Sequence, residues 1–419
     1  MEKIQSLKGT YDILPKDSAK WQYIENKIQQ ICKNFGYEEI RVPVFEYTDL
    51  FARGVGDTTD IVQKEMYTFR DKGDRSLTLR PEGTAGVVRS VLQHSLLAGA
   101  LPLKLYYLIT CYRNEKPQAG RFREFRQFGI EAYGAIDPRL DAEVIAVAKT
   151  LIDRLGITGY VVNINTIGCP SCREKYNQIL TDYLQINAAD LCGTCKDRLD
   201  KNPMRIIDCK SPQCQSIVAD APRITNHVCE ECETHFKQLQ HTLDTMGIEY
   251  TVNQSIVRGL DYYTKTVFEI TSDALGAQST ICGGGRYDGL IDQLGGKPTP
   301  GIGFGLGLER LILCMEAQGL SFGETAKADI FIATIGEDAK NAAAKIVYDL
   351  RKQGIFVQVD YMGRSVKAQM KYADKLEARY STVLGDDELA RGGTVVKNME
   401  TGDVTEVLLD DLANYLKQR

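Results

Sequence analysis

The chain has 419 residues, of which 43% are hydrophobic and 26% charged, an ordinary globular composition that argues against long disordered stretches. Its length favours two or three domains. The sequence shows no hydrophobic leader and no run of about 18 apolar residues, which predicts a cytoplasmic protein without a membrane partner. The formal net charge of −5 gives no general attraction to nucleic acid, so any RNA contact must use local basic patches.

The first expected element is a helix over residues 17–35. Ile24, Ile28 and Ile31 recur there at helical spacing, which is the pattern of one buried helix face. Gly36 supplies a stop signal. An extended segment, EEIRVPVFE, follows the helix.

An antiparallel hairpin is predicted next, from KLYYLITCYRNE and REFRQFGIEAYG around the turn-prone PQAGRF. Arg113 and Glu115 are expected on the first strand, where alternation would place them on one face. Arg121, Arg123 and Arg126 cluster at the loop and the second strand. Guanidinium groups suit phosphate oxygens, so this hairpin indicates phosphate binding. A solvated, salt-bridged edge hairpin is the alternative.

A cysteine-rich insertion follows a helix near residues 140–155 and a strand, YVVNINTI. Eight of the twelve cysteines lie there, and repeated CxxC pairs are typical of tetrahedral zinc sites. A reducing cytosol argues against disulfides. The candidate zinc ligands are Cys169, Cys172, Cys192, Cys195, Cys209, Cys214, Cys229 and Cys232. They allow one or two sites with the pairing left open, and buried cysteines without metal are the alternative.

Glycine-rich segments mark the return of the core. Apolar, β-rich sequence resumes at YYTKTVFEI, and ICGGGRYDGL and GIGFGLGLERLIL then each pass from a glycine-rich strand or turn into a helix. Neither GxxxxGK[ST] nor GxGxxG is present, and none of the four histidines lies in the glycine-rich or arginine-rich segments. The sequence therefore indicates nucleotide binding by arginines and argues against a histidine nucleophile or base.

A separate C-terminal domain is predicted from about Ala326, because strands and helices alternate there as in a βαβ unit with a parallel component. Lys367, Lys371, Lys375 and Arg379 recur every four residues on one expected helix. Like charges at that spacing repel. Such a stripe indicates a polyanionic partner, and a plain solvated face is the alternative.

Three of these segments together resemble the ordered motifs of class II aminoacyl-tRNA synthetases. The helix and strand ending at Pro43 are similar to motif one. The RxE element at Arg113 and Glu115 is similar to motif two, and GLGLER at 305–310 is similar to motif three.

Further segments narrow the resemblance to histidyl-tRNA synthetases. VRGLDYYTKTVFE at 257–269 and GGGRYDGL at 283–290 resemble the two signature peptides of that family, and TLRPEGT at 78–84 agrees. The resemblance runs from about Leu7 to the C-terminus, apart from the cysteine-rich insertion.

The resemblance implies an α+β fold in three parts. An antiparallel β-sheet core flanked by helices would comprise residues 1–168 and 246–322. Residues 169–245 would form the zinc-binding insertion, and residues 326–419 an α/β anticodon-binding domain. Motif one around Pro43 implies a homodimer.

The resemblance also implies the activity, in which ATP activates histidine to histidyl-adenylate before transfer to the 3′ end of tRNA(His), with Mg²⁺ at the phosphates and structural Zn²⁺ in the insertion. Arg113 and Arg258 would stabilise charge at the α-phosphate. The implied ATP-binding residues are Arg113, Glu115, Arg121 and Arg310. The implied histidine-binding residues are Glu82, Thr84, Arg113, Gln127, Glu131, Arg258, Tyr262, Tyr263 and Tyr287.

Two other functions are alternatives. A catalytically silent paralogue would resemble the regulatory subunit of ATP phosphoribosyltransferase, but this chain keeps Arg113, Arg258, Arg310 and a C-terminal module. A zinc-dependent RNA-binding module without catalysis is the other, and the intact pocket motifs argue against it.

Overall fold

The computed structural model describes residues 3–56, 59–258, 260–323 and 326–418. The chain divides into two compact units, Met1–Gly323 and Glu324–Arg419. Arg419, the last residue of the expected C-terminal domain, lies outside the described residues. Among the described helices, none combines the length and apolar character needed to cross a bilayer.

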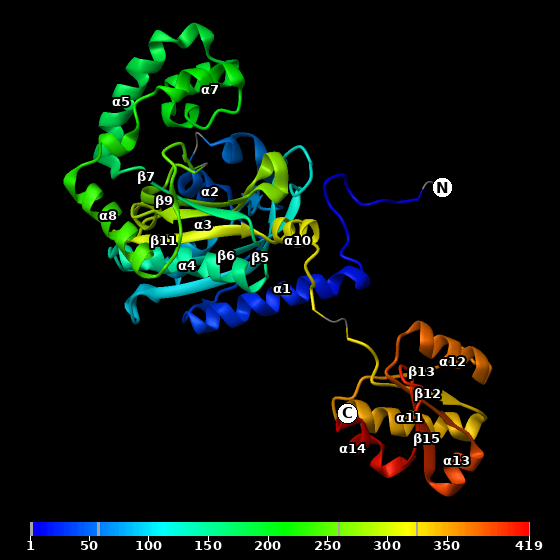
Figure 1. The fold of residues 1–419 in the computed structure, drawn as a ribbon. Helices are drawn as coiled ribbons and strands as arrows, with labels where there is room; N and C mark the ends of the chain where they lie inside the picture. The colour runs from blue at the N-terminus through cyan, green and yellow to red at the C-terminus, as the bar shows by residue number, and fades with distance from the viewer. Residues whose placement is uncertain (1–2, 57–58, 259, 324–325, 419) are drawn as a thin grey trace. The chain divides into compact units, whose positions relative to one another are not determined.

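A large mixed sheet forms the core of the first unit (Figure 1). Its strand order is β1-β5-β6-β11-β10-β9-β7-β8. All neighbours from β5 to β7 pair antiparallel, whereas β1 with β5 and β7 with β8 pair parallel. The strands are β1 (Glu38–Glu39), β5 (Leu103–Tyr112), β6 (Glu124–Tyr133), β7 (Tyr160–Thr166), β8 (Thr251–Val252), β9 (Thr264–Ser272), β10 (Thr280–Arg286) and β11 (Gly301–Gly307). This antiparallel-dominated sheet confirms the expected α+β core.

Helices cover both faces of the sheet (Figure 1). The expected first helix is α1 (Pro15–Asn34), which begins two residues early because proline is well suited to the first helical turn. Together with α4 (Pro138–Arg154) it packs on the face that carries Tyr106. Helix α3 (Thr84–Gln93) packs on the opposite face, against Tyr107. Tyr106 and Tyr107, which are adjacent on β5, thus pack into the hydrophobic cores on opposite faces of the sheet, as strand alternation requires.

Four other helices and a small sheet complete the core around the site. Helix α2 (Thr48–Val55) and the short helix η1 (Ile61–Glu65) lie beside a three-stranded sheet of β2 (Phe45–Tyr47), β4 (Ser76–Leu79) and β3 (Tyr67–Arg70), in that order. Helices α9 (Leu290–Gln293) and α10 (Leu308–Ala317) follow β10 and β11.

The predicted hairpin is confirmed, but the position of two of its residues is corrected. The β5–β6 ladder ends at the Tyr112–Glu124 pair, so Arg113 and Glu115 lie in the connecting loop and not on a strand. The chain leaves the ladder because the backbone N–H of Asn114 bonds to the carbonyl of Glu65, 2.7 Å away. The alternation argument for these two side chains was therefore wrong.

The cysteine-rich insertion is helical and projects from the core (Figure 1). It contains α5 (Pro170–Ile186), α6 (Gly193–Leu199), the 3₁₀ turn η4 (Pro203–Ile206) and α7 (Pro212–Ala219). Helix α8 (Glu230–Thr245) returns the chain to the core, where its Leu239 and Leu243 are fully buried.

The second unit has a five-stranded sheet in the order β13-β12-β14-β15-β16. The first three strands are parallel and the last two antiparallel. The strands are β12 (Ile330–Thr334), β13 (Val357–Val359), β14 (Tyr380–Leu384), β15 (Gly393–Asn398) and β16 (Val404–Leu408), and the helices are α11 (Glu337–Lys352), α12 (Val366–Lys375), α13 (Asp386–Arg391) and α14 (Leu412–Lys417). The predicted βαβ domain with a parallel component is thus present.

The basic stripe of this unit is shorter than expected. Lys367, Lys371 and Lys375 are exposed on α12. Arg379 lies beyond the end of that helix and forms a 3.7 Å ion pair with Asp329. The stripe is therefore three lysines long.

Candidate active site

A cavity of about 880 Å³ in the first unit collects the residues predicted for substrate binding. Its wall includes Glu82, Thr84, Arg113, Glu115, Arg121, Gln127, Arg258, Tyr262, Tyr263, Tyr287 and Arg310. Glu131 is the one predicted substrate residue that does not line the wall. It lies directly behind it, bonded to Thr84 and Tyr287.

Glu131 is a carboxyl group buried in a ring of hydroxyl donors. Thr84 Oγ1 donates to it at 2.7 Å, Tyr107 Oη at 3.1 Å, and Tyr287 Oη donates to its other oxygen. Burial raises the pKa of Glu131 to about 8, even though hydrogen bonds from Tyr287 and Thr84 act in the opposite direction. Burial thus favours the protonated form of this carboxyl group.

Two glycines in neighbouring strands make room for the polar side chains of the site. A Cβ at Gly303 of β11 would lie 2.1 Å from Oε2 of Glu131, and a Cβ at Gly283 of β10 would lie 2.3 Å from the guanidinium of Arg258. The glycine-rich segments are therefore required for close approach.

Three tyrosines form an aromatic wall beside Glu131. The ring centroid of Tyr262 lies 4.7 Å from that of Tyr263, in a tilted arrangement, and 5.5 Å from that of Tyr287, in an edge-on arrangement. All three side chains are at most 5% exposed. Gln127 borders the same wall, and its Oε1 accepts the backbone N–H of Gly83 at 3.0 Å. These contacts hold the wall rigid.

Arg258 approaches the cavity opposite the hairpin loop. Its guanidinium pairs with Glu269 and lies 5.8 Å from the ring centre of Tyr263. Burial alone would lower its pKa, but the charge of Glu269 outweighs burial and raises it, so Arg258 stays cationic. Its Nε is buried and has no partner among the described residues, which leaves a donor for a ligand.

The other cations come from the hairpin loop and from α10. Arg113 donates from Nε to the carbonyl of Pro81 at 2.8 Å and stacks over Phe125. Arg121 lies 3.4 Å from Glu115. Arg310 bonds to the carbonyl of Gly120, and burial and then repulsion by Arg121 lower its pKa. All three arginines line the same cavity, where Glu115 pairs with Arg121.

Glu82 and Thr84 occupy the start of α3. The two oxygens of Glu82 accept the backbone N–H groups of Thr84 and Ala85 at 2.7 and 2.9 Å. Glu82 therefore caps the helix and also lines the cavity. Burial raises its pKa.

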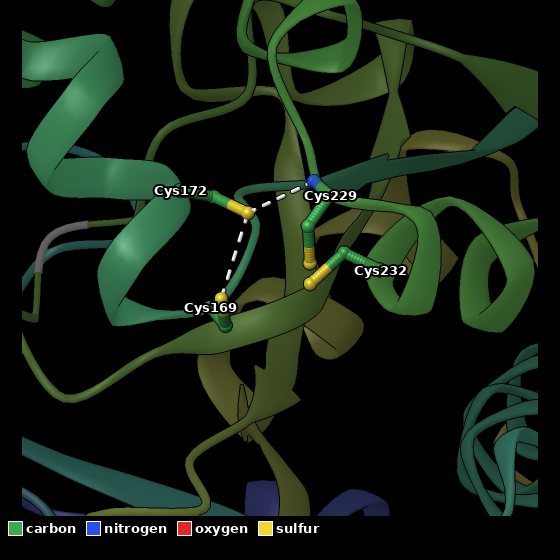
Figure 2. A group of neighbouring side chains, drawn as sticks. All are labelled: Cys169, Cys172, Cys229 and Cys232. Carbon is green, nitrogen blue, oxygen red and sulfur yellow. Dashed lines mark hydrogen bonds between the residues drawn. The ribbon is translucent and has the colours of Figure 1, made fainter.

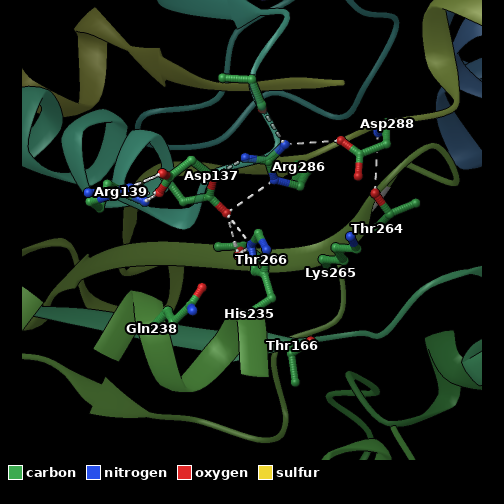
Figure 3. Close-up of polar contacts among 12 residues, drawn as sticks. Asp137, Arg139, Thr166, His235, Gln238, Thr264, Lys265, Thr266, Arg286 and Asp288 are labelled. Carbon is green, nitrogen blue, oxygen red and sulfur yellow. Dashed lines mark hydrogen bonds and ion pairs between the residues drawn. The ribbon is translucent and has the colours of Figure 1, made fainter. Parts of the chain in front are cut away.

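A buried charge network holds β10 in place (Figure 3). Arg286 forms an ion pair with Asp141 of α4, and both side chains are fully buried. His235 of α8 and Thr266 of β9 bond to the same carboxylate at 2.9 and 2.6 Å. Burial would raise the pKa of Asp141, but Arg286 and His235 outweigh it and lower it. The network fixes the strand next to Tyr287.

The structure sorts the eight insertion cysteines into two groups of four. The base group is Cys169, Cys172, Cys229 and Cys232, and the central group is Cys192, Cys195, Cys209 and Cys214. Within each group the four sulfurs lie within 4.8 Å of one another. All eight are free thiols.

Both groups bring four sulfurs close enough together to hold a metal ion. Sulfurs around one Zn²⁺ lie roughly 3.8 Å apart, and here Cys169–Cys172 and Cys192–Cys209 are 3.5 and 3.9 Å apart. Backbone N–H groups also donate to sulfur, as from Cys229 to Cys172 at 3.1 Å (Figure 2). The backbone N–H of Cys195 lowers the pKa of Cys192 to about 7, which favours the metal-binding thiolate.

Sequence reasoning missed two partners of the site. Tyr107, a core residue of β5, donates to Glu131, and Glu269 of β9 pairs with Arg258. Glu269 closes the VRGLDYYTKTVFE segment, so its place in a charged motif was an available signal. No sequence signal distinguishes Tyr107 from its neighbour Tyr106.

The core is an antiparallel-dominated sheet with a cavity. Arginines reach this cavity from a hairpin loop and from the helix after a glycine-rich strand. This arrangement defines a class II aminoacyl-tRNA synthetase core. Residues 9–311 match the family described as histidyl-tRNA synthetase. Residues 329–419 match the family described as anticodon binding domain. The chain belongs to the histidyl-tRNA synthetase family.

Individual relatives are similar over their full length. The histidine–tRNA ligase of Acetivibrio thermocellus is 59% identical, with 99% of each chain covered. That of Clostridioides difficile is 53% identical, with 98% of each covered. The apo histidyl-tRNA synthetase of Staphylococcus aureus superposes with a TM-score of 0.85 at 42% identity, covering 99% of this chain and 100% of that one.

Proposed function

We propose that this chain is a histidine–tRNA ligase, which joins histidine to tRNA(His) with conversion of ATP to AMP and pyrophosphate. The observation that carries the proposal is one cavity with two chemically different ends. A buried carboxyl ringed by tyrosines suits an imidazole, and the arginine cluster suits a polyphosphate. No feature of the cavity favours the regulatory-subunit alternative.

Histidine recognition follows from the state of Glu131. An imidazole carries one donor and one acceptor nitrogen near neutral pH. Glu131, whose pKa is about 8, would bond to one ring nitrogen once the ligand displaces the hydroxyl of Thr84 or Tyr287 that now occupies its oxygens. Tyr263 and Gln127 border the remaining space. Glu82 and Thr84 lie where a carboxylate and a hydroxyl can hold the α-amino group. A side chain without ring nitrogens would leave these buried groups unpaired.

Adenylate formation needs positioning and charge neutralisation. The carboxylate oxygen of histidine attacks the α-phosphorus of ATP, and the bond to pyrophosphate breaks. Arg113 and Arg258 would bind the oxygens of the five-coordinate phosphorus. Arg121 and Arg310 would bind the outer phosphates, and Glu115 the adenine amine. Mg²⁺ bound to those phosphates would supply further positive charge.

Transfer uses the same cavity. The 3′-terminal ribose hydroxyl of the tRNA attacks the carbonyl carbon of the adenylate, and AMP leaves with the bonding electrons. No histidine of this chain lines the cavity among the described residues. In this proposal an oxygen of the departing phosphate receives the proton of the hydroxyl group.

We infer two structural zinc ions per chain, one at the base group and one at the central group. All-cysteine tetrahedral sites are closed and structural. The base group joins the first and last helices of the insertion, because Cys172 lies in α5 and Cys232 in α8. That site would hold the insertion closed at its attachment to the core.

A homodimer is proposed through the motif-one region. Phe45 and Phe69 of the small sheet are 53% and 44% exposed, with ring centroids 6.4 Å apart, and Val44 and Tyr47 are exposed beside them. An apolar patch of this kind marks an interaction surface. Sedimentation equilibrium should give twice the chain mass, and a stable, fully active monomer would contradict the assignment.

The second unit is proposed to bind the anticodon region of tRNA(His), supported by its three-lysine stripe. A tRNA partner also agrees with the cytoplasmic location inferred from the sequence. Charging of a tRNA(His) transcript with labelled histidine tests the whole proposal. Histidine esterified to the terminal adenosine is the expected product. RNA binding without charging would instead support a non-catalytic RNA-binding module.

A further inference from the structure

The central cysteine group lies next to the catalytic cavity in the fold. Three residues of the insertion, Arg205, Asp208 and Lys210, belong to the cavity wall. Arg205 lies on η4, which in the sequence stands between Cys195 and Cys209 of the central group. Asp208 and Lys210 are the two sequence neighbours of Cys209. A segment bracketed by metal-binding cysteines thus forms part of the active-site wall.

Direct polar contacts hold this segment against the core. Arg198 of α6 forms a 2.9 Å ion pair with Asp60, at the start of η1. Asn202 donates from Nδ2 to Oδ1 of Asp261 at 2.9 Å. Arg173 of α5 donates to the backbone carbonyl of the same aspartate at 3.2 Å. Asp60 itself lines the cavity, so these contacts fix the insertion at the cavity rim.

The two cations of this segment differ in their partners. Lys210 is exposed and pairs with Asp208 at 2.6 Å. Arg205 is half-buried, and within the described part of the chain its guanidinium makes no hydrogen bond or ion pair. Burial lowers its pKa most, and the charges of Arg198 and Arg258 act in the same direction, whereas the carboxylates of Asp208 and Asp60 raise it. Neither of these carboxylates forms an ion pair with Arg205, so the guanidinium donors of this half-buried cation are left for an anion that enters the cavity.

We propose that Arg205 is a phosphate-binding residue of the catalytic cavity, held in place by the metal of the central group. The proposal rests on the proposed function, which brings two phosphate-bearing substrates to this cavity. The phosphate belongs either to ATP or to the acceptor end of tRNA. Both offer the same anionic oxygens to a guanidinium fork.

The test compares Arg205→Ala with Lys201→Ala, a matched control that removes an exposed cation outside the cavity wall. Zinc content and thermal unfolding are measured first, to show that both variants keep the insertion. Binding of ATP and of an acceptor-stem RNA is then measured by calorimetry, together with the KM for ATP in pyrophosphate exchange and single-turnover transfer to tRNA.

Comparison of the ATP measurements with the RNA measurements identifies which substrate carries the phosphate. A charge-assisted hydrogen bond accounts for about tenfold or more in affinity. If ATP binds about tenfold more weakly and the KM for ATP rises, Arg205 binds the phosphates of ATP. If only RNA binding and transfer are impaired, Arg205 binds a phosphate of tRNA. Arg205→Lys should recover part of the loss. Wild-type values for Arg205→Ala in every arm would overturn the proposal. Weaker phosphate binding in a chain that lacks histidine-dependent exchange would refute the proposed function alone.

The dependence on metal has its own variant. Cys195→Ser should lower the zinc content from about two to about one per chain, because it breaks one tetrahedral site and leaves the base group intact. It should reproduce the binding defect of Arg205→Ala, and the double variant should show little further loss. Normal phosphate binding in a Cys195→Ser chain with one zinc would overturn the coupling.

Discussion

Tyr287 donates its hydroxyl hydrogen to Glu131 from a neighbouring segment, and both side chains are at most 2% exposed. Glu131 lies on β6, whereas Tyr287 directly follows β10. The two are brought together across β11, whose Gly303 leaves the space that the carboxyl group fills. In the proposed function, these two segments, which are far apart in the sequence, would together provide specificity for an imidazole.

The pKa of Glu131 makes the stability of the empty enzyme depend on pH. The pKa is about 8 in the fold and near 4.3 in an unfolded chain. Below both values the group is protonated in both states. Between them the folded state binds one more proton, so the free energy of unfolding falls as pH rises, and it levels off above about 8.

Glu131→Gln should remove this dependence. The free energy of unfolding of the variant and of the wild type is measured with urea between pH 5 and 8.5. The value for the variant minus the value for the wild type should rise steadily as the pH rises. Glu38→Gln, at an exposed position on β1, should show a flat difference. A flat difference for Glu131→Gln as well would show that the carboxyl titrates normally in the fold.

Arg258→Ala should slow adenylate formation about 10²- to 10³-fold, the size expected when a transition-state charge contact is removed. Histidine binding should weaken far less than adenylation slows, because Glu131 and the tyrosines remain. Rapid-quench single-turnover kinetics measure the first quantity and equilibrium dialysis the second. Arg154→Ala, which removes an exposed arginine at the end of α4, is the control. Near-normal adenylation by Arg258→Ala would refute the assignment.

Purified protein should contain about two zinc ions per chain, and a chelator should expose the insertion before the core. Atomic absorption gives the stoichiometry, and hydrogen exchange shows which helices lose protection. Cys172→Ser should remove one zinc and loosen α5 and α8, whereas Cys32→Ser, a buried cysteine outside both groups, should keep two. Metal-free protein with unchanged protection would contradict both sites.

Reversal of the three-lysine stripe should affect tRNA and not histidine activation. Lys367, Lys371 and Lys375 changed together to glutamate should weaken tRNA binding and reduce its salt dependence, because phosphate contacts release counterions. Pyrophosphate exchange without tRNA should stay at the wild-type rate, since the cavity lies wholly within the first unit.

The matched control reverses three exposed lysines on α11, at positions 340, 345 and 352. Filter binding across a salt series distinguishes a specific face from a general charge effect. If tRNA affinity falls equally in both triple variants, α12 has no special role in tRNA binding.

The sequence predicted those parts of the site whose signals are local. Arg258 and Arg310 lie in segments that the sequence singled out, and the structure brings both to one cavity. The end of a β-ladder is different, because it depends on a competing bond from Asn114 to a distant carbonyl. For that reason Arg113 was wrongly expected on a strand.

Cysteine pairing also depends on the three-dimensional fold. Spacing alone joined Cys169 with Cys172 but left open which second pair completes each site. The return of α8 to the core brings Cys229 and Cys232 to the first pair. The place of Arg205 on the cavity wall likewise follows from the contacts of α5 and α6 with the core, which have no sequence signal.

The central claim is that this cavity activates histidine in preference to every other amino acid. The most direct measurement is amino-acid-dependent exchange of labelled pyrophosphate into ATP by the purified chain, with each of the twenty amino acids in turn and no tRNA present. Histidine alone should support rapid exchange, and Glu131→Gln should lose most of that activity through a raised KM for histidine. Exchange that is absent with histidine, or equally fast with another amino acid, would contradict the account.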